Sequence, residues 1–337
     1  MWKRGVVVVV IICMVGSSLI GCESKKKERS SISIGVIFDS FIIERWQRDK
    51  EAFETKAKDE LGADVFIENA NGDVNEQKRL LEKFIDKQVD VIVIVPINSD
   101  AVTDAVKRAR KQGIKVISYD RLVKNADVDL YITFDNEKVG ELMALTIMNQ
   151  TKQGNSIFMM CGPREDNNVS LVQDGFLGNI NTREYKIVER HYATAWHAED
   201  GYEWLSEYLA KGKQVEAIMC GNDGIAGQVI RALSERKLAG NVCVVGQDAD
   251  LDACQRIVEG TQTMTVYKPV SKLAGLAAEY AIKFAKGEEV ETQSTFFDGT
   301  YDVPYKGLDP IAITKTNIDL IIQDGFHSRE DIYMNIK

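Results

Sequence analysis

Histidine and closely spaced cysteine are the scarcest chemical features of this sequence. Its 337 residues include only three histidines, none in an HExxH or similar spacing, and none of its six cysteines forms a CxxC pair. Spacings of that kind build most protein zinc sites. A GxSxG nucleophile motif is missing as well. We therefore expect no metal site, no cofactor and no enzyme activity.

Positive charge is also in deficit. The chain carries 42 lysines and arginines against 51 aspartates and glutamates, which gives a formal net charge of -9. An acidic protein gains nothing from the counterion release that drives binding to a phosphate backbone. We therefore expect no nucleic-acid partner.

The cysteines divide into two groups. Cys13 lies in an apolar leader and Cys22 at its end, whereas the other four follow or lie within apolar runs further along the chain. Buried free thiols are the favoured interpretation of these four, over a disulfide or a metal site. They are Cys161, Cys220, Cys243 and Cys254.

The leader begins with Lys3 and Arg4, continues with an apolar run over residues 6–12, and ends in the sequence LIGC at 19–22. The run is shorter than the roughly 20 residues that a membrane span needs. The segment resembles a bacterial lipobox, which implies a signal peptide over 1–21 and a lipid on Cys22. Residues 22–31 are polar and predict a flexible tether. The alternative, an uncleaved anchor, leaves the same result: the chain works outside the cytoplasmic membrane, attached to its outer face.

The remaining sequence predicts an α/β fold of two doubly wound parallel-sheet lobes. Short apolar runs alternate with amphipathic stretches, and the runs lack polar alternation, as in parallel strands covered by helices on both faces. Expected strands occupy 32–38, 64–67, 89–95 and 115–118, then 155–160, 184–189, 215–219 and 242–246. Expected helices occupy 45–61, 75–87 and 99–112, then 169–180, 198–210, 225–237 and 251–259.

Polar and aromatic residues cluster where these strands end, the edge at which open parallel sheets bind ligands. Trp46 and Trp196 offer flat faces to the C–H surface of a sugar ring, or are ordinary core residues. Around them lie groups that can donate hydrogen bonds to the hydroxyls of a sugar or accept hydrogen bonds from them. These groups are Asp120, Arg121, Asn168, Asn222, Asp248 and Lys268. For Asp248 the alternative is that it caps a helix.

Several blocks resemble those of bacterial D-xylose-binding proteins, members of the pentose- and hexose-binding family. The resemblance covers nearly all of 32–282. The blocks are ERWQ (44–47), ENANG (68–72), YDR (119–121), TFDNEKVG (133–140), GQDAD (246–250), GTQTMTVYKP (260–269) and IQDGFH (322–327).

This resemblance implies a periplasmic-binding-protein-like type I fold with a three-strand hinge. Lobe 1 would comprise 32–135 and 268–297, and lobe 2 would comprise 136–267 and 298–337. Trp46 and Trp196 would enclose the sugar ring, with Asn168 or its neighbour Asn167 contributing from the second lobe. The other groups named above would bind hydroxyls, and Lys268 would reach them from the hinge.

The expected function is binding of D-xylose and its delivery to an ABC importer in the membrane. One alternative is a sensory subunit that docks on the ectodomain of a membrane histidine kinase. Another is a receptor for a different pentose, hexose or sugar-like signal. An enzyme that uses Asp120 and Asp248 as a carboxylate pair is disfavoured, because both carboxylates, beside Arg121, are interpreted as groups that hold a ligand. A DNA-binding regulator is disfavoured because a leader occupies the place of its helix-turn-helix.

Overall fold

The structure is a computed structural model that describes residues 2, 31–151, 156–181, 183–292 and 294–336. Residues Ser31–Lys337 form one compact unit. Cys22 and nearly all of the expected signal peptide and tether lie outside the described residues. Among the residues that are described, no helix is both long and apolar enough to cross a membrane.

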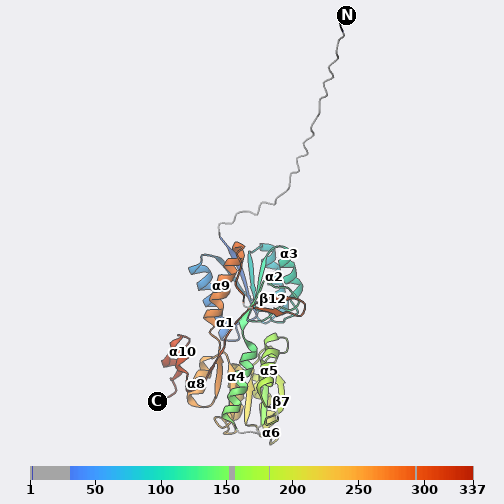
Figure 1. Ribbon diagram of the computed structural model, residues 1–337. Helices are drawn as coiled ribbons and strands as arrows, with labels where there is room; N and C mark the ends of the chain where they lie inside the picture. Colours follow the sequence, from blue (N-terminus) through green and yellow to red (C-terminus); the bar gives the residue numbers. More distant parts are fainter. Residues whose placement is uncertain (1, 3–30, 152–155, 182, 293, 337) are drawn as a thin grey trace. The chain divides into compact units, whose positions relative to one another are not determined.

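The compact unit is built on two sheets, each in its own lobe (Figure 1). The first has the order β11-β12-β5-β4-β3-β1-β2 and the second the order β13-β10-β9-β8-β6-β7. The strands of the first sheet are β1 (Ser33–Phe38), β2 (Asp64–Asn69), β3 (Val91–Ile94), β4 (Lys115–Tyr119), β5 (Leu130–Phe134), β11 (Ser294–Phe297) and β12 (Asp302–Leu308). Those of the second are β6 (Ser156–Cys161), β7 (Lys186–Tyr192), β8 (Ala217–Cys220), β9 (Cys243–Gln247), β10 (Met264–Tyr267) and β13 (Ile311–Ile313).

Helices cover both faces of each sheet. The first lobe carries α1 (Arg45–Glu54), the π-helix η1 (Thr55–Glu60), α2 (Val74–Lys87), α3 (Thr103–Lys111) and α9 (Val270–Lys286). The second carries α4 (Asn136–Gln150), α5 (Asn167–Asn179), α6 (Glu199–Ala210), α7 (Asp223–Ser234) and α8 (Leu251–Glu259), followed by α10 (Asp319–Gln323) and α11 (Arg329–Ile332). In Figure 1, α9 from late in the chain packs beside α1 from its beginning. The predicted doubly wound class is confirmed.

Strand periodicity explains why each sheet needs two helical layers. In β6, Ile157 and Met159 point into one hydrophobic core, whereas Phe158 and Met160 point into the core on the opposite face. All four are fully buried. Successive side chains of a strand alternate between faces, so an uninterrupted apolar strand requires cover on both.

The four cysteines outside the leader are free and buried, as the sequence predicts. Burial raises the pKa of the Cys161 thiol to about 12 and that of the Cys243 thiol to about 11. Such thiols are poor nucleophiles because the thiolate form is scarce at neutral pH.

Three segments connect the lobes. The chain passes from β5 through Asp135 into α4, from β10 through residues 268–269 into α9, and from β12 through residues 309–310 into β13. The third crossing differs from the expected one near residues 297–298. β12 pairs in parallel with β5, with Leu308 opposite Phe134, so residues 298–308 belong to the first lobe. Pro304 and Gly307 interrupt the apolar pattern of β12, which hid this strand in the sequence.

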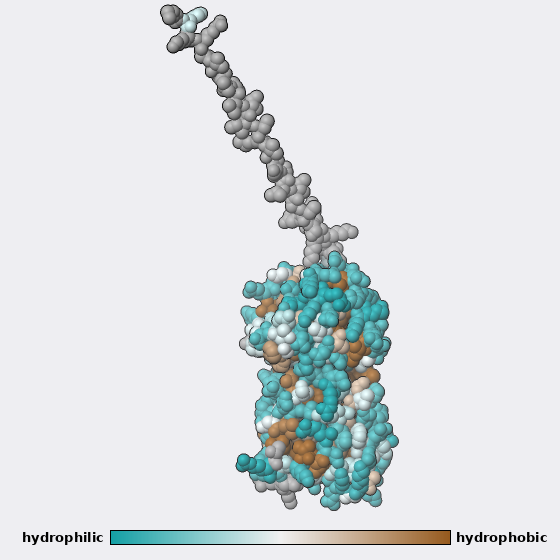
Figure 2. Space-filling model, turned by 90° about the vertical axis from the view of Figure 1, so that its right-hand side faces the viewer, coloured by the Kyte–Doolittle hydropathy of each residue, from teal (hydrophilic) through white to brown (hydrophobic). Residues whose placement is uncertain are grey.

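Hydrophilic side chains dominate the face in Figure 2, and hydrophobic ones gather in separate patches, one of them on the lower, second lobe. Large apolar residues that are partly exposed include Trp204 on α6, at 42% exposure. Its indole stacks on the His191 ring of β7, with 4.1 Å between ring centroids.

The segment after α10 ties the second lobe to α1 of the first. His327 is buried, with its Nδ1 3.1 Å from Arg48 Nη2 and its Nε2 2.8 Å from the Ala249 carbonyl oxygen. A guanidinium only donates and a carbonyl only accepts. Neutral imidazole with its proton on Nε2 therefore satisfies both contacts, whereas the doubly protonated ring would turn an N–H toward Arg48.

This geometry predicts that acid destabilises the folded protein through His327. Burial lowers the pKa of His327 and Arg48 lowers it further, against the Ala249 carbonyl, Glu44 and Asp331, which raise it. The folded state then binds fewer protons than the unfolded state, so stability is complete above the unfolded pKa and falls as pH drops below about 6.5. Urea unfolding across pH 8 to 5 should show this loss, and His327→Gln should reduce it.

Burial also lowers the pKa of His191, so His191 adds its own contribution to the loss of stability in acid. The slope of unfolding free energy against pH is therefore compared among the wild type, His327→Gln and His191→Gln. An unchanged slope in His327→Gln would contradict the prediction.

Candidate functional site

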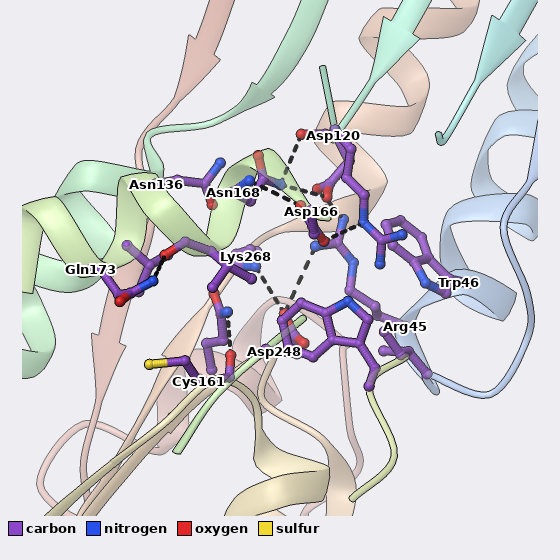
Figure 3. A pocket seen from close by; sticks show the side chains of 18 of the residues that line it. Arg45, Trp46, Asp120, Asn136, Cys161, Asp166, Asn168, Gln173, Asp248 and Lys268 are labelled. Atoms are coloured by element: carbon purple, nitrogen blue, oxygen red, sulfur yellow. Dashed lines mark hydrogen bonds and ion pairs between the residues drawn. The ribbon is translucent and has the colours of Figure 1, made fainter. Parts of the chain in front are cut away.

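A cavity lies between the two lobes, at the carboxyl ends of the parallel strands (Figure 3). Seven of the eight expected site residues line it: Trp46, Asp120, Arg121, Asn168, Trp196, Asp248 and Lys268. The strand-end rule therefore brings together residues that are far apart in the sequence.

Asn222 is the exception. It is buried, but its Oδ1 accepts a hydrogen bond from the Ile225 backbone N–H at 2.9 Å and caps α7. The neighbouring Gly221 lines the cavity in its place. The structure thus shows a helix cap at Asn222, and its expected contact with ligand stays a prediction. Between the two candidates on α5, Asn168 lines the cavity and Asn167 does not.

Asp120 and Asp248 occupy equivalent places in the two lobes. Each follows a central strand and adopts a left-handed backbone, with φ of 62° and 98°. The N–H of Asp120 donates to Ile132 O, and that of Asp248 to Val266 O, both at 2.8 Å. Aspartate tolerates this conformation better than bulky residues do. The turn carries each carboxylate into the cavity (Figure 3).

Arg45 connects these carboxylates, although in the sequence it is only one residue of the block 44–47 and was not among the expected site residues. Its Nη2 lies 2.8 Å from Asp120 Oδ2 and 3.2 Å from Asp49 Oδ1, and its Nη1 lies 3.8 Å from Asp248 Oδ1. The Tyr119 hydroxyl donates a hydrogen bond to Asp49 Oδ1 at 2.5 Å. The guanidinium is almost fully buried. No local motif marks Arg45, because its partners lie up to about two hundred residues away.

Burial raises the pKa of the Asp120 carboxyl, but the opposing effects of Arg45, Lys268 and Arg121 bring that pKa below its ordinary value. Lys268 Nζ also lies 3.0 Å from Asp248 Oδ1. Asp120 and Asp248 therefore both lie against cations. The Asp120 carboxylate is held ionised and able to accept hydrogen bonds from hydroxyl groups.

Arg121 is held by one carboxylate from each lobe. Its Nη1 lies 2.6 Å from Asp39 Oδ2, and its Nε lies 2.7 Å from Asp166 Oδ2. Burial alone lowers the pKa of this guanidinium, whereas Asp166 and Asp39 raise it above its ordinary value. Asp166 was not expected at the site, and its role depends on the docking of α5 against the first lobe.

The two tryptophans flank the Arg121 guanidinium, whose carbon lies 5.5 Å from the Trp46 ring centroid and 6.0 Å from that of Trp196. Trp196 has a left-handed backbone, with φ of 64°. Its ring lies so close to Gly162 that a Cβ there would come within 2.3 Å of it. Glycine at 162 is therefore a requirement of the indole's position.

Four buried polar atoms of the lining have no hydrogen-bond partner in the part of the chain that the structure describes. They are Nε1 of Trp46, Nε1 of Trp196, Oε1 of Gln247 and Oδ1 of Asp248, the last of which lies in ion-pair contact with Lys268. Buried polar groups are nearly always paired, so such atoms indicate capacity for a polar ligand. The lining thus combines two indole faces, unused donors and an acceptor, and ionised groups from both lobes.

Further polar lining residues were not predicted as ligands. Asn136 opens α4 directly after β5, a strand that the sequence analysis did not identify, and Gln173 lies one turn and a half into α5. If β5 had been predicted, Asn136 would have been expected near the carboxyl end of a strand, and the reasoning that identified Asp120 would have identified it too. Within the described residues, no group of three or more His, Cys, Asp or Glu side chains could hold a metal ion.

The fold and the cleft define a class of two-lobed binding proteins. A family model for the periplasmic binding protein domain matches residues 34–289. The chain therefore belongs to the periplasmic binding protein family, and its fold is the type I form expected from the sequence.

Within that family, it is similar to the D-xylose-binding periplasmic proteins of two bacteria. The Haemophilus influenzae protein is 41% identical over 96% of this chain and 98% of its own. The Escherichia coli protein is also 41% identical, over 89% of this chain and 92% of its own. A carbohydrate transporter solute-binding protein from Chloroflexus aurantiacus, solved with D-glucose, superposes with a TM-score of 0.83 at 26% identity, covering 90% and 98% of the two chains.

The buried network predicts that Arg45→Met destabilises the protein strongly. Removing the guanidinium leaves Asp49 and Asp120 without a principal partner inside the structure, and breaking a buried ion pair costs about 3 to 5 kcal/mol. Urea unfolding without added sugar measures the change. Arg79→Met is the matched control, because Arg79 forms an exposed pair with Glu76, and exposed pairs contribute little to stability. Equal effects of the two substitutions would contradict the prediction.

Proposed function

We propose that this protein binds D-xylose between its lobes and delivers it to a sugar ABC importer. The observation that carries the proposal is the cavity itself, in which two indoles flank ionised hydrogen-bonding groups from both lobes. Two relatives at 41% identity are named as D-xylose-binding proteins, which supports the choice of sugar.

The lining suits a pyranose ring in two ways. The C–H faces of the ring pack on Trp46 and Trp196, while its hydroxyls meet carboxylate acceptors and cationic donors at the edge. Asp120 accepts from the first lobe, Asp248 accepts from the second, and Lys268 donates from a hinge crossing. An analogue without one of these hydroxyls would leave buried polar groups unpaired, which opposes its binding.

Binding requires no chemical conversion of the sugar. A ligand that touches both lobes stabilises the closed arrangement by its differential affinity for that state. The three crossings between the sheets are the natural hinge for such a motion. The concentration of sugar outside the cell is then represented by the fraction of closed protein, which a membrane partner can recognise.

The relatives are named as periplasmic proteins, which agrees with work outside the cytoplasmic membrane. We propose a lipid on Cys22 as the anchor and an ABC permease as the partner. Co-purification from membranes of the native cells distinguishes the permease from a histidine kinase, the alternative partner.

The sugar assignment is tested by calorimetric titration of the purified protein, freed of bound sugar, with xylose, ribose, arabinose, glucose and galactose. Xylose should bind most tightly, with a Kd of about 1 µM or below. Trp196→Ala and Asp120→Asn should each weaken it at least about 30-fold, on the order of 2 kcal/mol. Trp204→Ala should not, because Trp204 lies on α6 outside the cavity lining. Absence of binding by all five sugars would contradict the assignment.

The anchor is tested by fractionating cells of the native host. Wild-type protein should sediment with membranes and incorporate a fatty-acid label, whereas Cys22→Ser should lose the label and appear in the soluble extracytoplasmic fraction. Cys161→Ser is the control, since Cys161 is buried in the folded protein. A wild-type protein without label would contradict lipidation.

A further inference from the structure

The beginning of α5, on the second lobe, contacts the first lobe through protein groups alone. Asp166 Oδ2 lies 2.7 Å from Arg121 Nε, and the Asn168 side-chain amide donates to Asp120 O at 3.0 Å. The Ser99 backbone N–H donates to Glu165 O at 3.3 Å. Figure 3 shows Asp166 and Asn168 pointing toward Asp120 and its neighbours. The Asn168 side-chain amide also lies 3.3 Å from Asp120 Oδ1, and among these contacts the ion pair is the one between Asp166 and Arg121.

Both oxygens of Asp166 are in use. Oδ1 accepts from the Asn168 backbone N–H at 2.9 Å and caps α5, while Oδ2 meets Arg121. The cap lies within the second lobe and does not depend on the first. The contact with Arg121, in contrast, crosses the cleft and exists only when the lobes are together.

Asp39 is the counterpart within the first lobe. One of its oxygens accepts from the Ser40 backbone N–H, and the other meets Arg121 Nη1 at 2.6 Å. Asp39 and Arg121 follow β1 and β4 of one sheet, so this pair persists whether the lobes are open or closed. The two carboxylates thus share a partner and a bonding pattern, and differ in the lobe that carries them.

We propose that Asp166 is a positioning residue that latches the closed arrangement by pairing with Arg121 across the cleft. The proposal deepens the sugar-binding function and rests on it. Closing the lobes forms one charge-assisted hydrogen bond at a site that the cap has already oriented. In the sugar-free protein the latch makes the closed state the majority, and a ligand selective for that state binds with an apparent affinity proportional to the closed fraction.

Neutral asparagine at 166 cannot do both tasks. An amide has one acceptor oxygen, which the cap uses in either state, and its amino group would face the Arg121 N–H. Asn is a good helix cap, so Asp166→Asn should preserve α5. Burial raises the pKa of the Asp166 carboxyl above its ordinary value, and the nearby Arg121 guanidinium opposes that rise.

The Ser99 amide reports closure directly, because its hydrogen bond crosses the cleft. Hydrogen–deuterium exchange of the purified sugar-free full chain, read on peptides that contain Ser99, is measured for the wild type, Asp166→Asn and Asp39→Asn. Asp166→Asn should speed exchange about tenfold, on the order expected for one charged hydrogen bond. Asp39→Asn should leave that exchange unchanged. Asp166→Ser, another capping residue, repeats the first arm if the asparagine variant folds poorly.

Titration with D-xylose forms the second arm. Asp166→Asn should weaken xylose binding by the factor by which the closed fraction falls, which is smaller than the change in exchange. If Asp166→Asn weakens xylose binding without changing sugar-free exchange, Asp166 is a direct sugar contact and the latch is overturned. Equal exchange in the Asp166 and Asp39 variants overturns it as well. The exchange arm contains no sugar, so it decides the latch even if xylose proves to be the wrong ligand.

Discussion

The compensation of buried charge governs this structure. Two arginines, a lysine and five carboxylates lie within the cleft and its walls, where an unpaired charge would be costly. Arg45 forms ion pairs with Asp49 and Asp120, and Arg121 forms ion pairs with Asp39 and Asp166. Since these pairs draw on both lobes, the electrostatic requirement also determines how the lobes meet.

Backbone geometry delivers the acceptors to that network. The two lobes place an aspartate after a central strand in a left-handed conformation, at Asp120 and at Asp248. The same turn in each lobe presents one carboxylate from each side of the cleft. In the proposed function, a ligand between them would contact one carboxylate from each lobe, which is the condition for coupling its binding to closure.

The aromatic residues and the ionic groups have different tasks. Trp46 and Trp196 offer faces that many ring compounds could use, whereas the charged rim demands hydroxyl groups at defined positions. Similar two-lobed structures bind other carbohydrates, as the glucose complex at 26% identity illustrates. Under the proposed function, selectivity would therefore reside in the rim, and under the proposed latch the propensity to close would reside partly in the contact of Asp166 with Arg121, which joins protein to protein.

Local sequence determined the alternation of buried strands and amphipathic helices, and with it the edge at which ligand residues gather. It also marked Asp120, Asp248 and both tryptophans, because strand ends and unusual residue types are visible in one dimension. Tertiary structure alone decided that Asn222 caps a helix, that β12 returns to the first sheet, and that Arg45 and Asp166 belong to the site. The reason is physical: periodicity reports which side of an element is buried, whereas ion pairs across a cleft join residues whose separation in sequence carries no signal.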